Sequence, residues 1–201
     1  MSRLGQAIFE QSFDFIDEVI TTEVEICLKL NDNYDVSKIQ LLENIESEFS
    51  QTTEHLKMPV YFSDHPDWLE IERISGLRKN DFVDKLIQNT FSIAMLGFLP
   101  GFLYLNGLPA ELHIPRKGKP SKHIESNSLA IGDKYLGTYS LGSPGGWHVL
   151  GKMACSLLQI AKLPPILIKP NSTIELLAVS KKEYEKILES SLNILQYNGQ
   201  S

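Results

Sequence analysis

The chain has 201 residues, of which 42% are hydrophobic and 22% are charged, and its formal net charge is −6. This composition is typical of a soluble globular protein, and the acidic balance argues against nucleic-acid binding, which needs a basic surface. No apolar run reaches the roughly 18 residues of a membrane-spanning helix, and the acidic residues near the N-terminus are unlike a signal peptide, so we expect a cytoplasmic protein without membrane contact.

The first 35 or so residues carry two different patterns. Residues 6–20 fit neither the helical nor the strand period, so a short strand and an amphipathic helix both stay open. Over residues 21–32 the apolar side chains alternate with polar ones, which predicts a half-buried strand.

Helices and one more strand are predicted next. Apolar residues at helical spacing indicate a helix over residues 38–49, and a strand follows over 57–63. Two further helices are predicted over residues 69–75 and 79–88, separated by Gly76. Residues 1–88 therefore predict a small N-terminal α/β domain.

From residue 91 onward the apolar runs become short and turn signals recur, which is typical of an all-β barrel or sandwich. The predicted strands are FSIAML, LHIP, SLAIGD, YLGTYSL, WHVLGKM, SLLQI, ILIKP and TIELLAV. Residues 180–197 have helical spacing and predict one C-terminal helix. The fold class is thus α+β, with a β-barrel domain and a C-terminal helix in residues 89–201.

The two cysteines, Cys27 and Cys155, are far apart and fit no disulfide framework or zinc motif. We expect both to be buried free thiols. No bound metal is predicted, although Asp64 and Asp67 could bind a cation if they are not simply part of a solvated loop.

The segment from residue 97 to 151 is unusually rich in glycine, proline and aromatic residues. It contains GFLPGFLYLNGLP (97–109), IPRKGKP (114–120) and SPGGWHVLG (143–151). Glycine permits positive φ and close approach to the backbone, and proline fixes φ. We therefore predict a binding surface made of turns and aromatic rings. A hydrophobic loop and a barrel corner that only fill the core remain the alternative.

Each motif suggests a role in binding. The first would fold over an apolar pocket, and its glycine spacing is not that of a phosphate-binding loop. Arg116 could engage a carboxylate or phosphate with two hydrogen bonds. The Ser143–Trp147 segment would form a tight turn whose amides bind an anion beside a flat indole. The predicted substrate-binding residues are Phe98, Gly101, Phe102, Tyr104, Arg116, Ser143, Gly145, Gly146 and Trp147.

No catalytic residue can be assigned from the motifs. His148 follows the Trp147 turn and His113 precedes the Arg116 motif, so either could act as a general base. A half-exposed structural histidine is the alternative at both positions.

The order GF-x-PGF-x-YL-x-GLP, then PR, then SPGGW-x-x-x-G resembles the family of KipI and the 5-oxoprolinase B subunit, also described as allophanate hydrolase subunit 1 or carboxyltransferase subdomain C/D. The resemblance implies a cyclophilin-like barrel with the aromatic motif on its groove. It also implies a hydrolase that acts on C–N bonds and opens 5-oxoproline with ATP as co-substrate. The partners would be a homologue of the family's C subunit and an A subunit, and the isolated chain would be inactive.

Two other functions are compatible with the same resemblance. One is a protein-interaction module that inhibits a sensor histidine kinase, and the other is a scaffold that stabilises the C subunit. The chain also departs from the family pattern: it lacks a second arginine near Ser121 and Lys122, and it has Gly137-Thr138-Tyr139-Ser140 where the family has a proline. These departures predict altered ligand binding.

Overall fold

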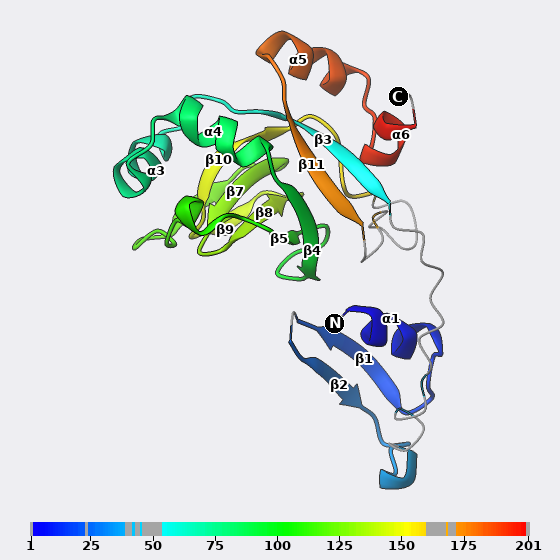
Figure 1. The fold of residues 1–201 in the computed structure, drawn as a ribbon. Helices are drawn as coiled ribbons and strands as arrows, with labels where there is room; N and C mark the ends of the chain where they lie inside the picture. The colour runs from blue at the N-terminus through cyan, green and yellow to red at the C-terminus, as the bar shows by residue number, and fades with distance from the viewer. Residues whose placement is uncertain are drawn as a thin grey trace. The chain divides into compact units, whose positions relative to one another are not determined.

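The computed structural model describes residues 2–22, 24–38, 42, 45, 54–159, 168 and 172–199. The chain divides into two compact units, shown in Figure 1. One comprises Met1–Thr52 with Ala94–Leu96, and the other comprises Thr53–Ile93 with Gly97–Ser201. The division lies well before residue 88, because β3 (His55–Tyr61) is hydrogen-bonded into the barrel.

The first unit contains a helix and a β-hairpin. Residues 6–20 hold both elements left open by the sequence, since α1 (Ser2–Glu10) is followed by β1 (Ile16–Thr21). β1 pairs antiparallel with β2 (Ile26–Leu30), which confirms the strand predicted there. The predicted helix over residues 38–49 lies mostly outside the described residues. Of its positions, the structure describes Lys38 at the end of a 3-10 turn, Val36–Lys38, a helical Leu42, and Ile45.

The second unit is built on a closed barrel of seven strands in the order β10-β3-β11-β4-β5-β8-β7. β3 pairs in parallel with β11, and the remaining pairs with a described register are antiparallel. The closed barrel is consistent with the cyclophilin-like fold that the resemblance implies. The strands besides β3 are β4 (Thr90–Leu96), β5 (Leu103–Asn106), β7 (Ser128–Gly132), β8 (Tyr135–Tyr139), β10 (His148–Met153) and β11 (Thr173–Ala178).

Barrel strands alternate inward and outward side chains, and the inward ones form the core. Met58 and Val60 of β3 are fully buried, as are Leu105 of β5 and Ile174 of β11. A separate two-stranded sheet of β6 (Ser121–Ile124) and β9 (Ser143–Gly145) lies outside the barrel order.

The helices of this unit mostly match the prediction. α3 (Trp68–Ser75) ends at Gly76, which has φ 71°, and α4 (Lys79–Ile87) follows. Trp68 Nε1 donates hydrogen bonds to the carbonyl oxygens of Ser63 and Leu150, each at 3.1 Å, and so attaches α3 to the barrel. Within the described helices, none combines the length and the apolar character that a membrane span needs.

The single C-terminal helix predicted over residues 180–197 is wrong. The structure has two helices, α5 (Lys181–Glu189) and α6 (Ile194–Asn198). Ser191 takes φ 52°, and Asn193 forms a capping box with Gln196 that starts a new helix. Apolar spacing alone does not detect such a break.

Two predicted strands and one cysteine also differ from expectation. LHIP (residues 112–115) is not a strand: Leu112 ends a 3-10 turn, Ala110–Leu112, and Ile114 forms an isolated bridge with Asp133. In SLLQI only Ser156 and Leu158 are bridge residues among the described positions, and ILIKP lies outside the described residues except for Ile168. Cys155 is buried and free as expected, whereas Cys27 is free but exposed.

Candidate functional site

An aromatic cavity of about 380 Å³ lies in the second unit where the three glycine-rich motifs meet. We call it the aromatic cavity. Its lining residues are Phe98, Phe102, Tyr104, Arg116, Lys117, Pro120, Tyr139, Pro144, Gly145, Gly146 and Trp147. Seven of the nine predicted binding residues are therefore brought together, and Gly101 and Ser143 are not among the lining residues.

Phe102 is the centre of the aromatic wall. Its ring centroid lies 4.8 Å from that of Tyr104, 5.0 Å from that of Tyr139 and 5.6 Å from that of Trp147. Phe102 and Trp147 are only 1% and 5% exposed, so both serve the barrel core and the cavity wall at once. The two interpretations that the sequence left open, core and binding surface, are thus compatible.

Gly137 makes this packing possible. It lies opposite Tyr104 in the pairing of β5 with β8. A Cβ atom at this position would come within 2.5 Å of Phe102 Cζ and 2.6 Å of Trp147 Cζ3. Only glycine leaves room for the two rings.

The loop before β5 contributes one wall residue and one anchor. Phe98 has φ 69°, is 59% exposed and packs edge-on against Phe102 at 5.4 Å. Positive φ is unfavourable for a residue with a Cβ atom. Gly101, with φ 77°, is held by its carbonyl oxygen, which accepts a hydrogen bond from Ser140 Oγ at 2.6 Å. Gly101 therefore positions the loop.

Arg116 supplies the positive charge of the aromatic cavity. Its Nε donates to Asp133 Oδ2 at 2.8 Å, and its guanidinium lies 5.7 Å from the Trp147 ring centroid. The side chain is 58% exposed, and its terminal nitrogens have no hydrogen-bond partner in the described part of the chain. These nitrogens can bind a carboxylate or phosphate bidentately.

Two tyrosines add polar groups to the cavity. Burial raises the pKa of Tyr139 to about 12, and it also raises the pKa of Tyr104. Both phenols are therefore neutral donors near pH 7. Tyr139 was not among the residues predicted from the sequence. The signal that could have found it is the strand period, since Tyr139 follows Gly137 at a spacing of two residues and so lies on the same face of β8.

The anion-binding turn predicted at Ser143–Trp147 is absent. Ser143–Gly145 is the strand β9, in register with β6 through Ser121 and Gly145. Neither Gly145 nor Gly146 has positive φ, so the backbone does not form the alternating conformation that aims successive amides at an anion. Ser143 is buried, and its hydroxyl donates to the Pro144 carbonyl at 3.1 Å.

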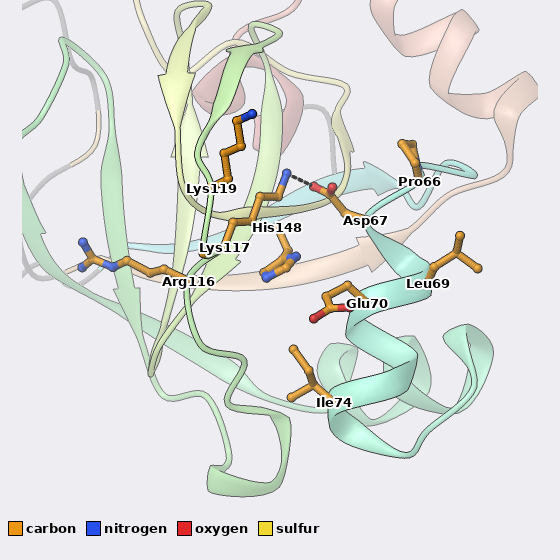
Figure 2. A pocket seen from close by; sticks show the side chains of 10 residues that line it. Pro66, Asp67, Leu69, Glu70, Ile74, Arg116, Lys117, Lys119 and His148 are labelled. Carbon is orange, nitrogen blue, oxygen red and sulfur yellow. Dashed lines mark ion pairs between the residues drawn. The ribbon is translucent and has the colours of Figure 1, made fainter.

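A second cavity, also about 380 Å³, lies between the start of α3 and residues 116–119. Figure 2 shows this polar cavity, with Arg116 directed away from the other labelled side chains. Asp67 Oδ2 accepts from Lys117 Nζ at 2.6 Å and from the Val149 amide at 2.7 Å. The side chains of Asp67 and Lys117 are only 13% and 14% exposed. Each charge is thus neutralised by the other, which argues against a cation site at Asp67.

His148 lines the polar cavity and not the aromatic one. It is 3% exposed, and its Nε2 lies 3.2 Å from the Pro115 carbonyl oxygen. Its Nδ1 is buried and has no hydrogen-bond partner in the part of the chain that the structure describes. A carbonyl can only accept, so Nε2 carries the proton and Nδ1 is an unused acceptor. Burial lowers the pKa of His148 and favours this neutral form.

The remaining candidates are occupied by structural contacts. His113 Nε2 lies 3.1 Å from the Leu108 carbonyl oxygen, and Asp64 pairs with Lys79 at 2.5 Å. In the described ranges no three His, Cys, Asp or Glu side chains gather where they could hold a metal ion. Neither His113 nor Asp64 reaches the aromatic cavity.

Comparison with known proteins agrees with the sequence resemblance. Residues 1–168 match the family model of the carboxyltransferase domain, subdomain C and D. The 5-oxoprolinase B subunit of Bacillus subtilis (strain 168) is 28% identical over 152 residues, which cover 75% of this chain and 63% of that protein. The 5-oxoprolinase B subunit of Escherichia coli O157:H7 is 33% identical over 121 residues, which cover 59% of this chain and 56% of that protein.

The fold is shared with a solved structure as well. The crystal structure of TTHA0988 aligns with a TM-score of 0.80 at 22% identity, covering 89% of this chain and 36% of that chain. The chain spans about three-fifths of the length of these two curated relatives, 63% and 56% respectively.

Proposed function

Because the chain belongs to the family of the carboxyltransferase domain, subdomain C and D, with 5-oxoprolinase B subunits among its relatives, we propose that it is the B subunit of an ATP-dependent 5-oxoprolinase. The complex would open the cyclic amide of 5-oxoproline to glutamate, with ATP hydrolysed as the co-substrate. A homologue of the C subunit, together with an A subunit, would complete it. The proposal places the substrate in the aromatic cavity of this chain.

The observation that carries the proposal is the pairing of Arg116 with an aromatic wall. 5-Oxoproline is a small, flat ring with one carboxylate. The guanidinium over Trp147 suits the carboxylate, and the rings of Phe102 and Tyr104 suit the ring of the substrate. A volume of about 380 Å³ is at the small end of the range for ligand pockets.

The exposed side of the cavity supports a role for partners. Phe98 and Arg116 are 59% and 58% exposed. Hydrolysis with a phosphorylated intermediate requires that water be excluded until the proper step. We therefore propose that a partner protein of the complex covers this side, and that the isolated chain has no 5-oxoprolinase activity. We assign no ATP-binding residue to this chain.

The test is co-expression with candidate C and A subunits, followed by an assay of ADP release that depends on 5-oxoproline. Arg116→Ala is expected to lower kcat/KM about tenfold to a hundredfold, since a hydrogen-bonded contact to a charged group contributes about 1.5–3 kcal/mol. Arg73→Ala is the matched control, because Arg73 is also an exposed arginine paired with a carboxylate, Glu70, but does not line the cavity.

Two results would contradict the proposal. One is an assembled wild-type complex that releases no ADP in response to 5-oxoproline. The other is a purified single chain that turns over ATP and 5-oxoproline by itself. Unchanged activity of Arg116→Ala would reject the cavity as the substrate site. No surface in the described residues favours the kinase-inhibitor alternative.

A further inference from the structure

The aromatic cavity contains a nearly buried phenol whose hydroxyl has no hydrogen-bond partner among the described residues. Tyr139 is 2% exposed, and its ring packs edge-on against Phe102 at 5.0 Å and Phe98 at 6.2 Å. Its hydroxyl lies directly against the backbone of Gly145, where a Cβ atom would collide with it. Across the described ranges this hydroxyl makes no hydrogen bond, and it is not among the fully enclosed polar atoms, so it faces the cavity.

A second phenol lies nearby. Tyr104 is half-buried, and its ring lies 4.8 Å from that of Phe102 and 5.4 Å from that of Trp147. Its hydroxyl likewise has no hydrogen-bond partner in the described part of the chain. Trp147 touches both Tyr104 and the guanidinium of Arg116. Tyr104 thus shares Phe102 as a ring neighbour with Tyr139, and it shares Trp147 with Arg116.

An apolar wall does not need these hydroxyls. Phenylalanine at either position would keep the ring contacts. Both tyrosines line the cavity, and their hydroxyls have no acceptor in the described part of the chain, so both can donate to a ligand. Two such donors in one cavity suit a ligand with an acceptor oxygen at this end.

The protonation state of the phenols fixes what they can do. Burial raises the pKa of both tyrosines, that of Tyr139 to about 12, so each keeps its proton near neutral pH. A neutral phenol donates to a carbonyl oxygen and does not repel a carboxylate bound nearby. Arg116, in contrast, has only donors and a permanent positive charge.

We propose that Tyr139 and Tyr104 are specificity-determining residues that donate hydrogen bonds to the ring carbonyl of the ligand, while Arg116 holds its carboxylate. This inference rests on the proposed function, because it assigns both ends of the substrate in the same cavity. The site then selects a small flat ring that carries a carbonyl and a carboxylate. A ring of equal size that carries only the carboxylate loses the phenol contacts.

The experiment is a binding titration of the assembled complex without ATP, at about pH 7. The probes are 5-oxoproline and cyclopentanecarboxylate, which has a similar ring and carboxylate but no carbonyl. Tyr139→Phe and Tyr104→Phe are each expected to weaken 5-oxoproline binding about threefold to tenfold, the usual range for one hydrogen bond. Binding of cyclopentanecarboxylate should stay unchanged in both variants. Arg116→Ala should weaken both probes.

Tyr184→Phe is the matched control. Tyr184 is also a partly buried tyrosine in ring contact, packing on Tyr61 at 5.7 Å, but it does not line the cavity. The inference is overturned if both cavity variants bind 5-oxoproline as the wild type does, or if they lose both probes equally. A wild type that binds no 5-oxoproline overturns the proposed function together with the inference. Phenol-dependent binding without ADP release supports the inference and rejects the proposed function.

Discussion

Two cavities of equal size flank residues 114–120, and they differ in how their polar groups are satisfied. Each measures about 380 Å³, and both are lined in part by Arg116 and Lys117. In the polar cavity, Lys117 is paired with the largely buried Asp67 (Figure 2). In the aromatic cavity, two phenols and the terminal nitrogens of Arg116 lack partners in the described residues.

The difference shows that volume does not identify a binding site here. Arg116 and Lys117 are adjacent but differ in their partners: Lys117 is paired with Asp67, whereas Arg116 lies over Trp147 and its terminal nitrogens have no partner in the described residues. Charges that neutralise each other stabilise the segment, whereas donors without acceptors are available to a ligand. Substitutions on the two sides can therefore separate stability from binding.

The largest effect is expected from Phe102→Ala, which removes the centre of the aromatic wall. Phe102 is 1% exposed and contacts the rings of Tyr104, Tyr139 and Trp147. Truncating a buried phenylalanine costs about 3–5 kcal/mol, so the free energy of unfolding in urea should fall by about that much. Phe98→Ala removes an exposed ring of the same cavity and should leave stability nearly unchanged while weakening 5-oxoproline binding. If Phe102→Ala lowered the free energy of unfolding no more than Phe98→Ala does, the aromatic wall would not be part of the core.

Asp67→Asn is expected to have the next largest effect, because it breaks the ion pair of the polar cavity. The variant leaves Lys117, with 14% side-chain exposure, without its carboxylate. Breaking a buried pair costs about 3–5 kcal/mol, and we expect about 3 kcal/mol because a little solvent reaches both groups.

Asp64→Asn is the matched control, since Asp64 forms an aspartate–lysine pair in the same loop but is 95% exposed. Such surface pairs contribute little, so its urea midpoint should stay at the wild-type value. If the two variants shifted the midpoint equally, the polar cavity would not depend on a buried pair.

The sequence predicted the barrel texture and most of the aromatic cavity for a shared reason. Both depend on local composition: short apolar runs with frequent turns, and glycine, proline and aromatic residues close together. Arg116 and Trp147 were found because each lies within such a motif.

Contacts between distant segments could not be predicted in the same way. β3 belongs to the barrel because it pairs in parallel with β11 near the other end of the chain, which no local pattern encodes. The β9 strand replaced the expected turn because β6 pairs with it across an intervening hairpin. Tyr139 was not predicted: the strand period puts it on the same face as Gly137, but only the pairing of β8 with β5 places that face toward Phe102.

Gly137→Ala should lower the free energy of unfolding moderately, because it crowds the rings of the aromatic wall. The added Cβ would lie 2.5 Å from Phe102 Cζ, so the rings must shift. Overpacking of this kind costs about 1–3 kcal/mol, and 5-oxoproline binding should weaken with it. Gly118→Ala is the control on the polar side, because a Cβ there meets nothing within 4 Å and its φ is not positive. If Gly137→Ala were as stable to urea as Gly118→Ala, the rings of the aromatic wall would be able to rearrange around the added Cβ without cost.

The smallest effect concerns pH and the neutral His148 of the polar cavity. Burial lowers the pKa of His148 in the folded state, and the positive charge of Lys117 lowers it further. Asp67 and Glu70 act in the opposite direction, because their negative charges favour the protonated form. The unfolded chain, with a histidine pKa of about 6.5, then binds more protons than the folded chain in mild acid. The contribution of His148 to the free energy of unfolding is therefore fully present above about pH 6.5, and it is lost as the pH falls toward the folded-state pKa.

His148→Gln should reduce this pH dependence of the unfolding free energy, measured between about pH 7.5 and pH 5.5, above the range in which carboxylates titrate. A residual slope is expected from His65, whose pKa burial also lowers, and His65→Gln should remove that part. Since neither histidine lines the aromatic cavity, binding of 5-oxoproline to both variants should match the wild type at about pH 7.5. A wild type that becomes more stable on acidification, or a slope that survives both substitutions, would show that His148 is not held neutral by its surroundings.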